Sequence, residues 1–253
     1  MCGICGIINR SNDTPIDLEV LRSMVAIQQH RGPDELSTFI DRNVGLGHAR
    51  LSIIDLSTGS QPISNEDKSI WVVFNGEIFN YIELREDLQK KGHFFSTTSD
   101  TEVLVHLYEE YGSEFISQLN GQFAFAIWDS KDQSLLIARD RVGIRPVYYH
   151  TSDDQFSFAS EIKSLLMNPK IPRAVNPIGL KQIFTIWTTL GEVTPYQDIL
   201  ELPPGHFLLF KNGTITTRKY WELNFAEELV SDLSLEDAAE QLKELLIDST
   251  RLR

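Results

Sequence analysis

The sequence has few cysteines and no long apolar run, and each shortage excludes a class of protein. Cys2 and Cys5 are the only cysteines among 253 residues, so they cannot form a disulfide framework. No run approaches the roughly 18 apolar residues that span a bilayer. The first ten residues, MCGICGIINR, also lack the basic start and apolar middle of a signal peptide. We therefore expect a cytoplasmic protein with no membrane partner.

Basic residues are also scarce. The chain has 23 Lys and Arg against 36 Asp and Glu, which gives a formal net charge of −13. Nucleic-acid binding needs a basic surface that displaces counterions from phosphates, so we expect no nucleic-acid partner. Three arginines, Arg139, Arg141 and Arg145, nevertheless cluster in ARDRVGIRP. A turn in which they pair with Asp140 and other carboxylates is the favoured interpretation, and an anion-binding site is the alternative.

The rest of the composition is typical of a globular protein, with 42% hydrophobic and 23% charged residues. Helical spacing of apolar residues and β-rich runs between turn signals occur in separate blocks rather than in βαβ units. This order predicts an α+β fold with antiparallel hairpins, one of which turns at Asn212-Gly213. The expected helices are 17–30, 81–91 with an Asn80 cap, 101–112, 161–167 and 176–187, and the expected strands are 44–56, 69–79, 123–129, 134–140, 147–150, 156–160 and 205–221.

The last segment has a pattern of its own. Ser234 followed by Asp237 is a capping signal, and apolar residues from Leu235 to Leu252 recur at helical spacing. This pattern runs almost to the last residue without a C-cap glycine. We therefore expect residues 222–253 to be a linker and the first helix of a second, truncated domain.

Cys2 is the first candidate for chemistry. If Met1 is removed, a thiol and a free α-amine share one residue, and an amine with a pKa of about 7.7–8.0 can act as the base for that thiol. An incidental buried cysteine is the competing interpretation. Cys2 and Cys5 also match C-x-x-C, but a zinc site needs two further ligands at paired spacing, and a redox pair normally opens a helix. We therefore expect no metal site.

Two further segments carry polar groups next to β-rich runs. Asn75 and Gly76 follow WVVF; as a turn signal they would end the strand, and as donors they would bind the oxyanion of a tetrahedral intermediate. Arg50 suits either a carboxylate ligand or a structural salt bridge. Asp100 suits a helix cap, or it could join Glu77 in binding an ammonium group.

Together these segments resemble one protein family. The sequence is similar to the N-terminal glutaminase domain of glutamine-hydrolysing asparagine synthetases, a class II amidotransferase and N-terminal nucleophile hydrolase. The similarity covers Met1 to about Trp221. Nine motifs carry it in order: MCGICGI, HRGPD, RLSIID, FNGEIFNY, SDTEV, GQFAFAIWD, RDRVGIRPVYY, ASEIKSL and LPPGH.

The resemblance implies a four-layer αββα sandwich over residues 1–221 and assigns the site. Cys2 is then the nucleophile once Met1 is gone, and a chain that retains Met1 should be inactive. Arg31 and Asp34 are expected to be mainly structural. The other roles are the oxyanion hole, from Asn75 and the Gly76 N–H; the α-carboxylate site, from Arg50; the α-ammonium site, from Glu77 and Asp100; and backbone contacts around Leu51 and Ile53.

The implied reaction is hydrolysis of glutamine to glutamate and ammonia. Ammonia would pass to a C-terminal synthetase domain of the same full-length chain, most simply to make asparagine from aspartate. Neither residues 1–221 nor 222–253 should need a cofactor, because ATP and Mg are expected only in that domain, whose Ser-Gly-Gly-x-Asp-Ser loop is absent from this sequence. A different acceptor and a catalytically silent docking domain are the alternatives, and a homodimer is possible.

Overall fold

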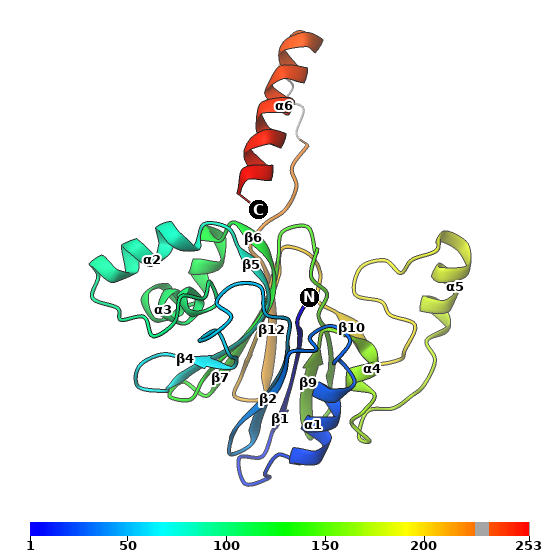
Figure 1. Cartoon of the computed structure of the whole chain (residues 1–253). Helices are drawn as coiled ribbons and strands as arrows, with labels where there is room; N and C mark the ends of the chain where they lie inside the picture. Colours follow the sequence, from blue (N-terminus) through cyan, green and yellow to red (C-terminus); the bar gives the residue numbers. More distant parts are fainter. Residues whose placement is uncertain (226–232, 253) are drawn as a thin grey trace.

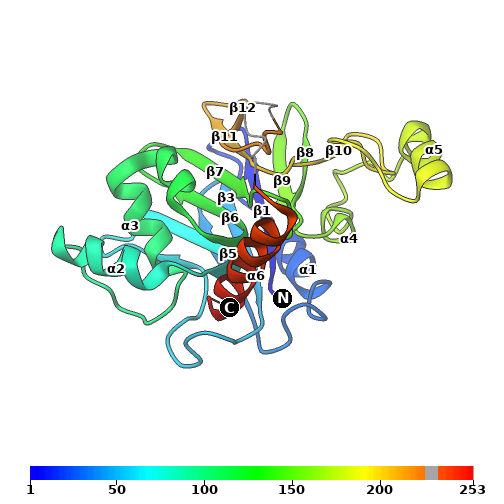
Figure 2. The same cartoon turned by 90° about the horizontal axis from the view of Figure 1, so that it is seen from above.

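Two antiparallel six-stranded sheets lie face to face, and helices cover their outer faces (Figure 1, Figure 2). The structure is a computed structural model that describes residues 1–225 and 233–252. The first sheet, in spatial order, consists of β10 (Ile199–Glu201), β8 (Tyr148–Thr151), β9 (Gln155–Ala159), β1 (Gly3–Asn9), β3 (Val44–Arg50) and β2 (Glu35–Asp41). The second consists of β12 (Thr214–Lys219), β11 (His206–Lys211), β7 (Ser134–Arg139), β6 (Gly121–Asp129), β5 (Ile70–Ile78) and β4 (Ile63–Ser64).

The helices divide between the two outer faces. On the first sheet lie α1 (Leu18–Ala26) and α4 (Ile162–Leu165), and on the second lie α2 (Tyr81–Lys90), α3 (Glu102–Tyr111) and the 3₁₀ helix η1 (Gly112–Gln118). Two further helices, α5 (Pro177–Ile186) and α6 (Leu235–Arg251), extend away from this body (Figure 1). No helix within the described ranges is both long enough and apolar enough to cross a membrane.

Alternating side chains on each strand explain the four layers. Successive residues of a strand face opposite sides of its sheet. On β1, Ile4 and Ile8 pack between the two sheets, whereas Ile7 packs against the helices of the first sheet. On β5, Val73 points between the sheets and Val72 points toward α3. Both faces of both sheets are therefore buried, and the predicted αββα sandwich of α+β class is confirmed.

Most expected elements are present, but two expected helix caps are wrong. The Asn80 side chain makes no cap bond; its amide instead donates to the Gln118 carbonyl and accepts from the Asn120 N–H. Asp100 does not cap α3 either, because its carboxylate accepts the N–H of Ile78 on β5. Both side chains make these tertiary hydrogen bonds instead of accepting N–H groups at the start of a helix.

Two local predictions near the end of the chain are confirmed. Asn212 and Gly213 both have positive φ, 51° and 71°, as a type I′ hairpin turn requires, and they connect β11 to β12. Ser234 caps α6 by accepting the Asp237 N–H at 3.1 Å. Residues 226–232 and 253 of the expected linker and helix lie outside the described residues.

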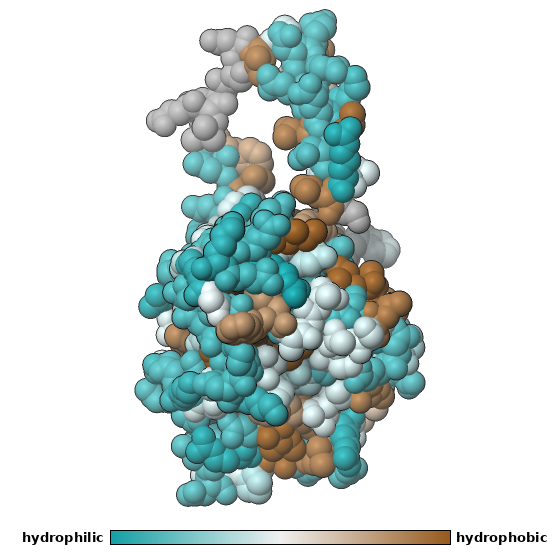
Figure 3. Space-filling view, turned by 60° about the vertical axis from the view of Figure 1, so that its left-hand side comes forward, coloured by the Kyte–Doolittle hydropathy of each residue, from teal (hydrophilic) through white to brown (hydrophobic). Residues whose placement is uncertain are grey.

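The apolar side of α6 is exposed. Figure 3 shows this helix standing clear of the body of the molecule, with apolar side chains on its surface. Packing against another surface normally supplies most of the stability of an amphipathic helix. The exposed apolar residues of α6 and the residue after it are Leu235, Leu242, Leu245, Leu246, Ile247 and Leu252.

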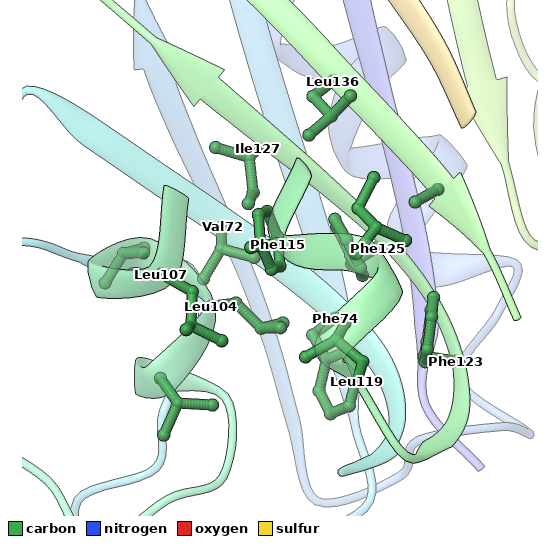
Figure 4. Close-up of a cluster of buried hydrophobic side chains, with 14 of the residues drawn as sticks. Val72, Phe74, Leu104, Leu107, Phe115, Leu119, Phe123, Phe125, Ile127 and Leu136 are labelled. Atoms are coloured by element: carbon green, nitrogen blue, oxygen red, sulfur yellow. The ribbon is translucent and has the colours of Figure 1, made fainter. Parts of the chain in front are cut away.

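Phe115 offers a test of this packing. It is fully buried between η1 and the second sheet, with its ring centroid 5.8 Å from that of Phe125 (Figure 4). Phe115→Ala should lower the free energy of unfolding in urea by about 3–5 kcal/mol, because it leaves a cavity. Phe184→Ala is the matched control: that ring is 85% exposed, so its loss should change stability by no more than about 0.5 kcal/mol. Similar losses for both variants would contradict this core.

Candidate active site

Cys2 lies where the first sheet ends. Gly3 pairs with Ala49 in the β1–β3 ladder, so Cys2 sits beside the residues that leave β3. The Leu51 N–H donates to the Cys2 sulfur at 3.4 Å, and the Arg31 Nε donates to the Cys2 carbonyl at 2.9 Å. Both the thiol and the backbone of Cys2 are therefore held in place.

A pocket that is open to solvent lies in front of this thiol. It forms where three segments meet: the end of β3, the second half of β5 and the residues just before α3. All eight residues singled out in the sequence line this one pocket: Cys2, Arg50, Leu51, Ile53, Asn75, Gly76, Glu77 and Asp100. The structure thus brings them together, while their individual roles stay predictions.

Asn75 is the most unusual of these residues. It is 0% exposed, and within the described residues neither its Oδ1 nor its Nδ2 atom has a hydrogen-bond partner. Leaving a buried polar group unpaired costs about 1–3 kcal/mol, and such groups are rare in native proteins. Because the amide lines the pocket beside Cys2, a ligand there can supply the missing partner.

Gly76 follows Asn75 on β5 and must be glycine. A Cβ atom at this position would lie 2.2 Å from the Gln122 carbonyl oxygen and 2.8 Å from the Phe123 Cα. Both are backbone atoms of β6, so no side-chain rotation can relieve the clash. Gly76 also lines the pocket.

Arg50 provides a positive charge in the pocket. Its side chain is nearly buried, its Nη2 donates to the Asp55 carbonyl at 2.5 Å, and its Nη1 lies 3.6 Å from Glu35 Oε2. Asp55 is held in turn by the N–H groups of Thr58 and Thr98, each at 2.8 Å. A positioned guanidinium of this kind suits a carboxylate ligand.

Asp100 and Glu77 provide negative charge. Burial raises the pKa of Asp100 to about 6, and the charge of Glu77 acts in the same direction, although the Ile78 N–H donates to the Asp100 carboxylate at 3.0 Å. A bound cation would relieve both the burial penalty and the repulsion. With Arg50, the pocket therefore has both cationic and anionic side chains.

The thiol is protonated in this chain at neutral pH. Burial raises the pKa of Cys2, and the Leu51 N–H, the N-terminal ammonium, Arg50 and Arg145 oppose the rise without cancelling it. Burial likewise lowers the pKa of the Met1 ammonium. Because Met1 lines the pocket and occupies the nitrogen of Cys2 in a peptide bond, Cys2 has no amine of its own here.

The HRGPD segment holds the backbone around the site. Arg31 pairs with Glu161 at 3.0 Å in addition to holding the Cys2 carbonyl. Asp34 accepts the Ser52 N–H at 2.7 Å. Neither side chain lines the pocket, and these contacts fit the structural part that the sequence analysis expects for both.

Several pocket residues were not assigned to the site from the sequence, among them Gln61 and Arg145. Gln61 accepts the Phe74 N–H at 2.7 Å and donates to the Thr101 hydroxyl at 3.3 Å, so it joins the β4–β5 and α3 sides of the pocket. Its segment gives no signal beyond a polar turn. Arg145 has a buried Nε with no hydrogen-bond partner within the described residues, and the sequence analysis named it only as part of the arginine cluster.

The expected pairing of that cluster with carboxylates is confirmed in part: Arg139 pairs with Glu201 at 2.7 Å. The Asp140 carboxylate instead accepts backbone N–H groups, among them those of Phe123 and Arg145. The Arg139 guanidinium also holds the turn, because it donates to the Gly143 and Arg145 carbonyls, each at 3.0 Å. Arg141 donates to the Ser117 carbonyl.

Comparisons with known proteins agree with this geometry. The family described as "Glutamine amidotransferase domain" matches residues 1–221. The chain is 42% identical over 228 residues to "Asparagine synthetase [glutamine-hydrolyzing] 1" of Bacillus subtilis. This alignment covers 89% of the chain and 36% of that protein. It is 35% identical over 267 residues to "Amidase chry2" of Gibberella zeae, covering 100% of the chain and 39% of that protein. The chain therefore spans well under half the length of these relatives.

A solved structure shows the same fold. The B. subtilis glutamine phosphoribosylpyrophosphate amidotransferase, complexed with ADP and GMP, superposes with a TM-score of 0.60 at 21% identity, over 87% of this chain and 49% of that chain. At this identity the likeness concerns the fold alone. It agrees with the αββα sandwich described above.

The raised pKa of Asp100 predicts a pH-dependent stability. The folded chain keeps this proton up to about pH 6, whereas an ordinary Asp loses it near 3.8. Between these values the native state binds more protons than the unfolded state, so burial of Asp100 lowers the free energy of unfolding as pH rises. Asp100→Asn removes this effect. Relative to the wild type, the variant should gain roughly 2–3 kcal/mol between pH 4 and pH 7, measured by urea unfolding. Parallel pH profiles would contradict the shift.

Proposed function

This chain belongs to the glutamine amidotransferase domain family, and we propose that its Cys2 pocket hydrolyses glutamine and that the ammonia serves a synthetase domain. One observation carries the proposal: the Cys2 thiol shares a pocket with the fully buried amide of Asn75, which has no hydrogen-bond partner within the described residues. A nucleophile that shares a pocket with such an available donor is the arrangement that acyl transfer requires.

Recognition of glutamine follows from the opposite charges in the pocket, because the α-carboxylate and the α-ammonium of glutamine are on the same carbon. Arg50 binds the α-carboxylate, and Glu77 with Asp100 binds the α-ammonium. Backbone groups at Leu51 and Ile53 complete the pocket. Binding the ammonium offsets the burial penalty on Asp100, so this carboxylate is ionised in the complex.

The first chemical step needs removal of Met1. The freed α-amine of Cys2 then takes the thiol proton, and the sulfur attacks the side-chain amide carbon of glutamine. Asn75 Nδ2 and the Gly76 N–H donate to the oxyanion that forms. The amine returns the proton to the leaving nitrogen, the C–N bond breaks, and ammonia departs from a γ-glutamyl thioester.

Water completes the reaction. It attacks the thioester carbon, a proton passes to the Cys2 sulfur as the C–S bond breaks, and glutamate leaves. We propose that the ammonia passes to an ATP- and Mg-dependent synthetase domain of a longer chain, with aspartate as the acceptor. The glutaminase steps themselves use only the residues of this pocket and no cofactor.

A different acceptor is the second candidate. One of the relatives is named an amidase rather than an asparagine synthetase, so the same glutaminase domain can accompany other chemistry. A catalytically silent docking domain is the less favoured alternative, because the pocket retains the nucleophile and its predicted donors.

A cytoplasmic location belongs to the proposal and fits the free thiols of Cys2 and Cys5. Light scattering would detect the possible homodimer.

The deciding experiment measures glutamate release from glutamine. Intact mass first separates Met1-free protein from protein that retains Met1. We expect release by the Met1-free form, none by the form with Met1, and none by Cys2→Ala. Cys5→Ala is the matched control, because Cys5 is fully buried on β1 and outside the pocket. Activity that survives Cys2→Ala would rule out the mechanism.

Asn75→Ala tests the oxyanion hole separately. It removes one donor, so kcat should fall by roughly 10²–10³ while KM changes little. The control is Asn43→Ala: Asn43 is also a buried amide, but its Nδ2 donates to the Asn9 carbonyl at 2.7 Å, away from the pocket. That variant should lose stability and keep its kcat. Equal rates for the two variants would show that Asn75 does not act on the transition state.

A further inference from the structure

A second cluster of reactive side chains lies outside the Cys2 pocket, beside α3 (Figure 1). Glu66, His93 and His106 each offer one ligand atom, and these atoms lie within 4.8 Å of one another. A fourth residue, Glu109, faces both imidazoles. The sequence gives no hint of this cluster, because the two histidines are far apart along the chain.

We propose that Glu66, His93, His106 and Glu109 form a binding site for a divalent zinc-like cation. The candidate ligand atoms are the Nδ1 atoms of both histidines and the Oε2 atoms of both glutamates. Two imidazoles with two carboxylates form a donor set that zinc accepts and that Mg²⁺ and Ca²⁺, which prefer oxygen alone, do not favour. The inference is independent of the glutaminase proposal.

The spacing of these atoms suits a tetrahedral ion. Glu109 Oε2 lies 3.0 Å from His106 Nδ1 and 3.6 Å from His93 Nδ1. Glu66 Oε2 lies 3.9 Å from His106 Nδ1. With metal–ligand bonds of about 2.0–2.1 Å, the ligand atoms of a tetrahedral zinc site are about 3.3 Å apart. The three distances fall on either side of that value, so small movements complete the site.

The other polar atom of each ligand faces a partner of its own. Glu66 Oε1 accepts the Phe94 N–H at 3.1 Å, and Glu109 Oε1 accepts the Asn65 side-chain N–H at 2.8 Å. His93 Nε2 lies 3.0 Å from Glu110. Metal-binding imidazoles and carboxylates normally have such outer partners, which orient them.

His106 completes this pattern from inside the protein. Its side chain is 1% exposed, and its Nε2 has no hydrogen-bond partner within the described residues but lies 4.0 Å from Glu102 Oε1. The Glu102 carboxylate is anchored by the N–H groups of Ser96 and Thr97, each at 2.7 Å. A small rotation of the imidazole on binding metal would bring its Nε2–H onto Glu102.

Charge also favours a cation. Four carboxylates, those of Glu66, Glu102, Glu109 and Glu110, lie near the two imidazoles. In the part of the chain that the structure describes, the ammonium of Lys91 is bound to this group, and it pairs with Glu110. Two neutral imidazoles and two carboxylates balance one divalent ion. The ion would tie the β4–β5 turn and the segment leading to Asp100 to helix α3, and thus support one wall of the Cys2 pocket.

The test is zinc titration by calorimetry, with untagged, EDTA-treated protein in a Cys2→Ala background so that the thiol cannot bind metal. We expect one Zn²⁺ per chain, no displacement by Mg²⁺, and a Tm about 5–10 °C higher at a zinc concentration of about 100 Kd. X-ray absorption should show nitrogen and oxygen neighbours at about 2.0 Å and no sulfur at about 2.3 Å.

Variants separate this site from adventitious binding. Glu66→Gln and His93→Gln should each weaken zinc binding by more than about tenfold, while their metal-free Tm stays close to that of the parent. His30→Gln is the matched control, since His30 also pairs with a surface glutamate, Glu161, at 2.9 Å, and should bind zinc normally. Zinc binding that is absent in the parent, or unchanged in Glu66→Gln and His93→Gln, would overturn the proposal and leave a network of histidine–glutamate contacts.

Discussion

Pairing of β1 with β3, and packing of both strands onto β5, is the constraint on which the rest of the structure depends. It places a residue next to the N-terminus at the inner end of the sandwich rather than on a free tail. The β5–β6 ladder then brings Asn75 and Gly76 to the same end. Without this register, the thiol and its neighbouring donors would lie on different faces, because a shift of one residue reverses every side chain of a strand.

The pocket concentrates groups that would destabilise an ordinary core. Among the residues that the structure describes, the Asn75 amide and the Arg145 Nε are buried without hydrogen-bond partners, and Asp100 is buried near the Glu77 carboxylate. Cores of three well-packed apolar clusters surround these groups and offset their cost. Local features of this kind, held by a rigid frame, are typical of functional sites. These unpaired or repelling polar groups line the pocket, where a bound ligand can pair with them.

Several residues of the pocket were predictable because they lie in short segments. Asn75, Gly76 and Glu77 are consecutive, and Arg50 and Leu51 are adjacent, so a motif captures each set. Gln61 and Arg145 were not recognised as pocket residues, because their position depends on which distant segments lie beside them. For Asp100 the sequence left a helix cap and a binding residue open, and the structure places its carboxylate on the Ile78 N–H of β5.

By itself, the sequence determined the α+β class, since its helical and β-rich segments occur in separate blocks, and its resemblance to a known family implied the four layers. It also determined the Asn212-Gly213 hairpin, since the positive φ angles there are local. Tertiary structure alone decided the surroundings of titratable groups. The raised pKa of Asp100 and the meeting of Glu66, His93 and His106 depend on distances between segments that are remote along the chain, and desolvation and charge act through space rather than along the sequence.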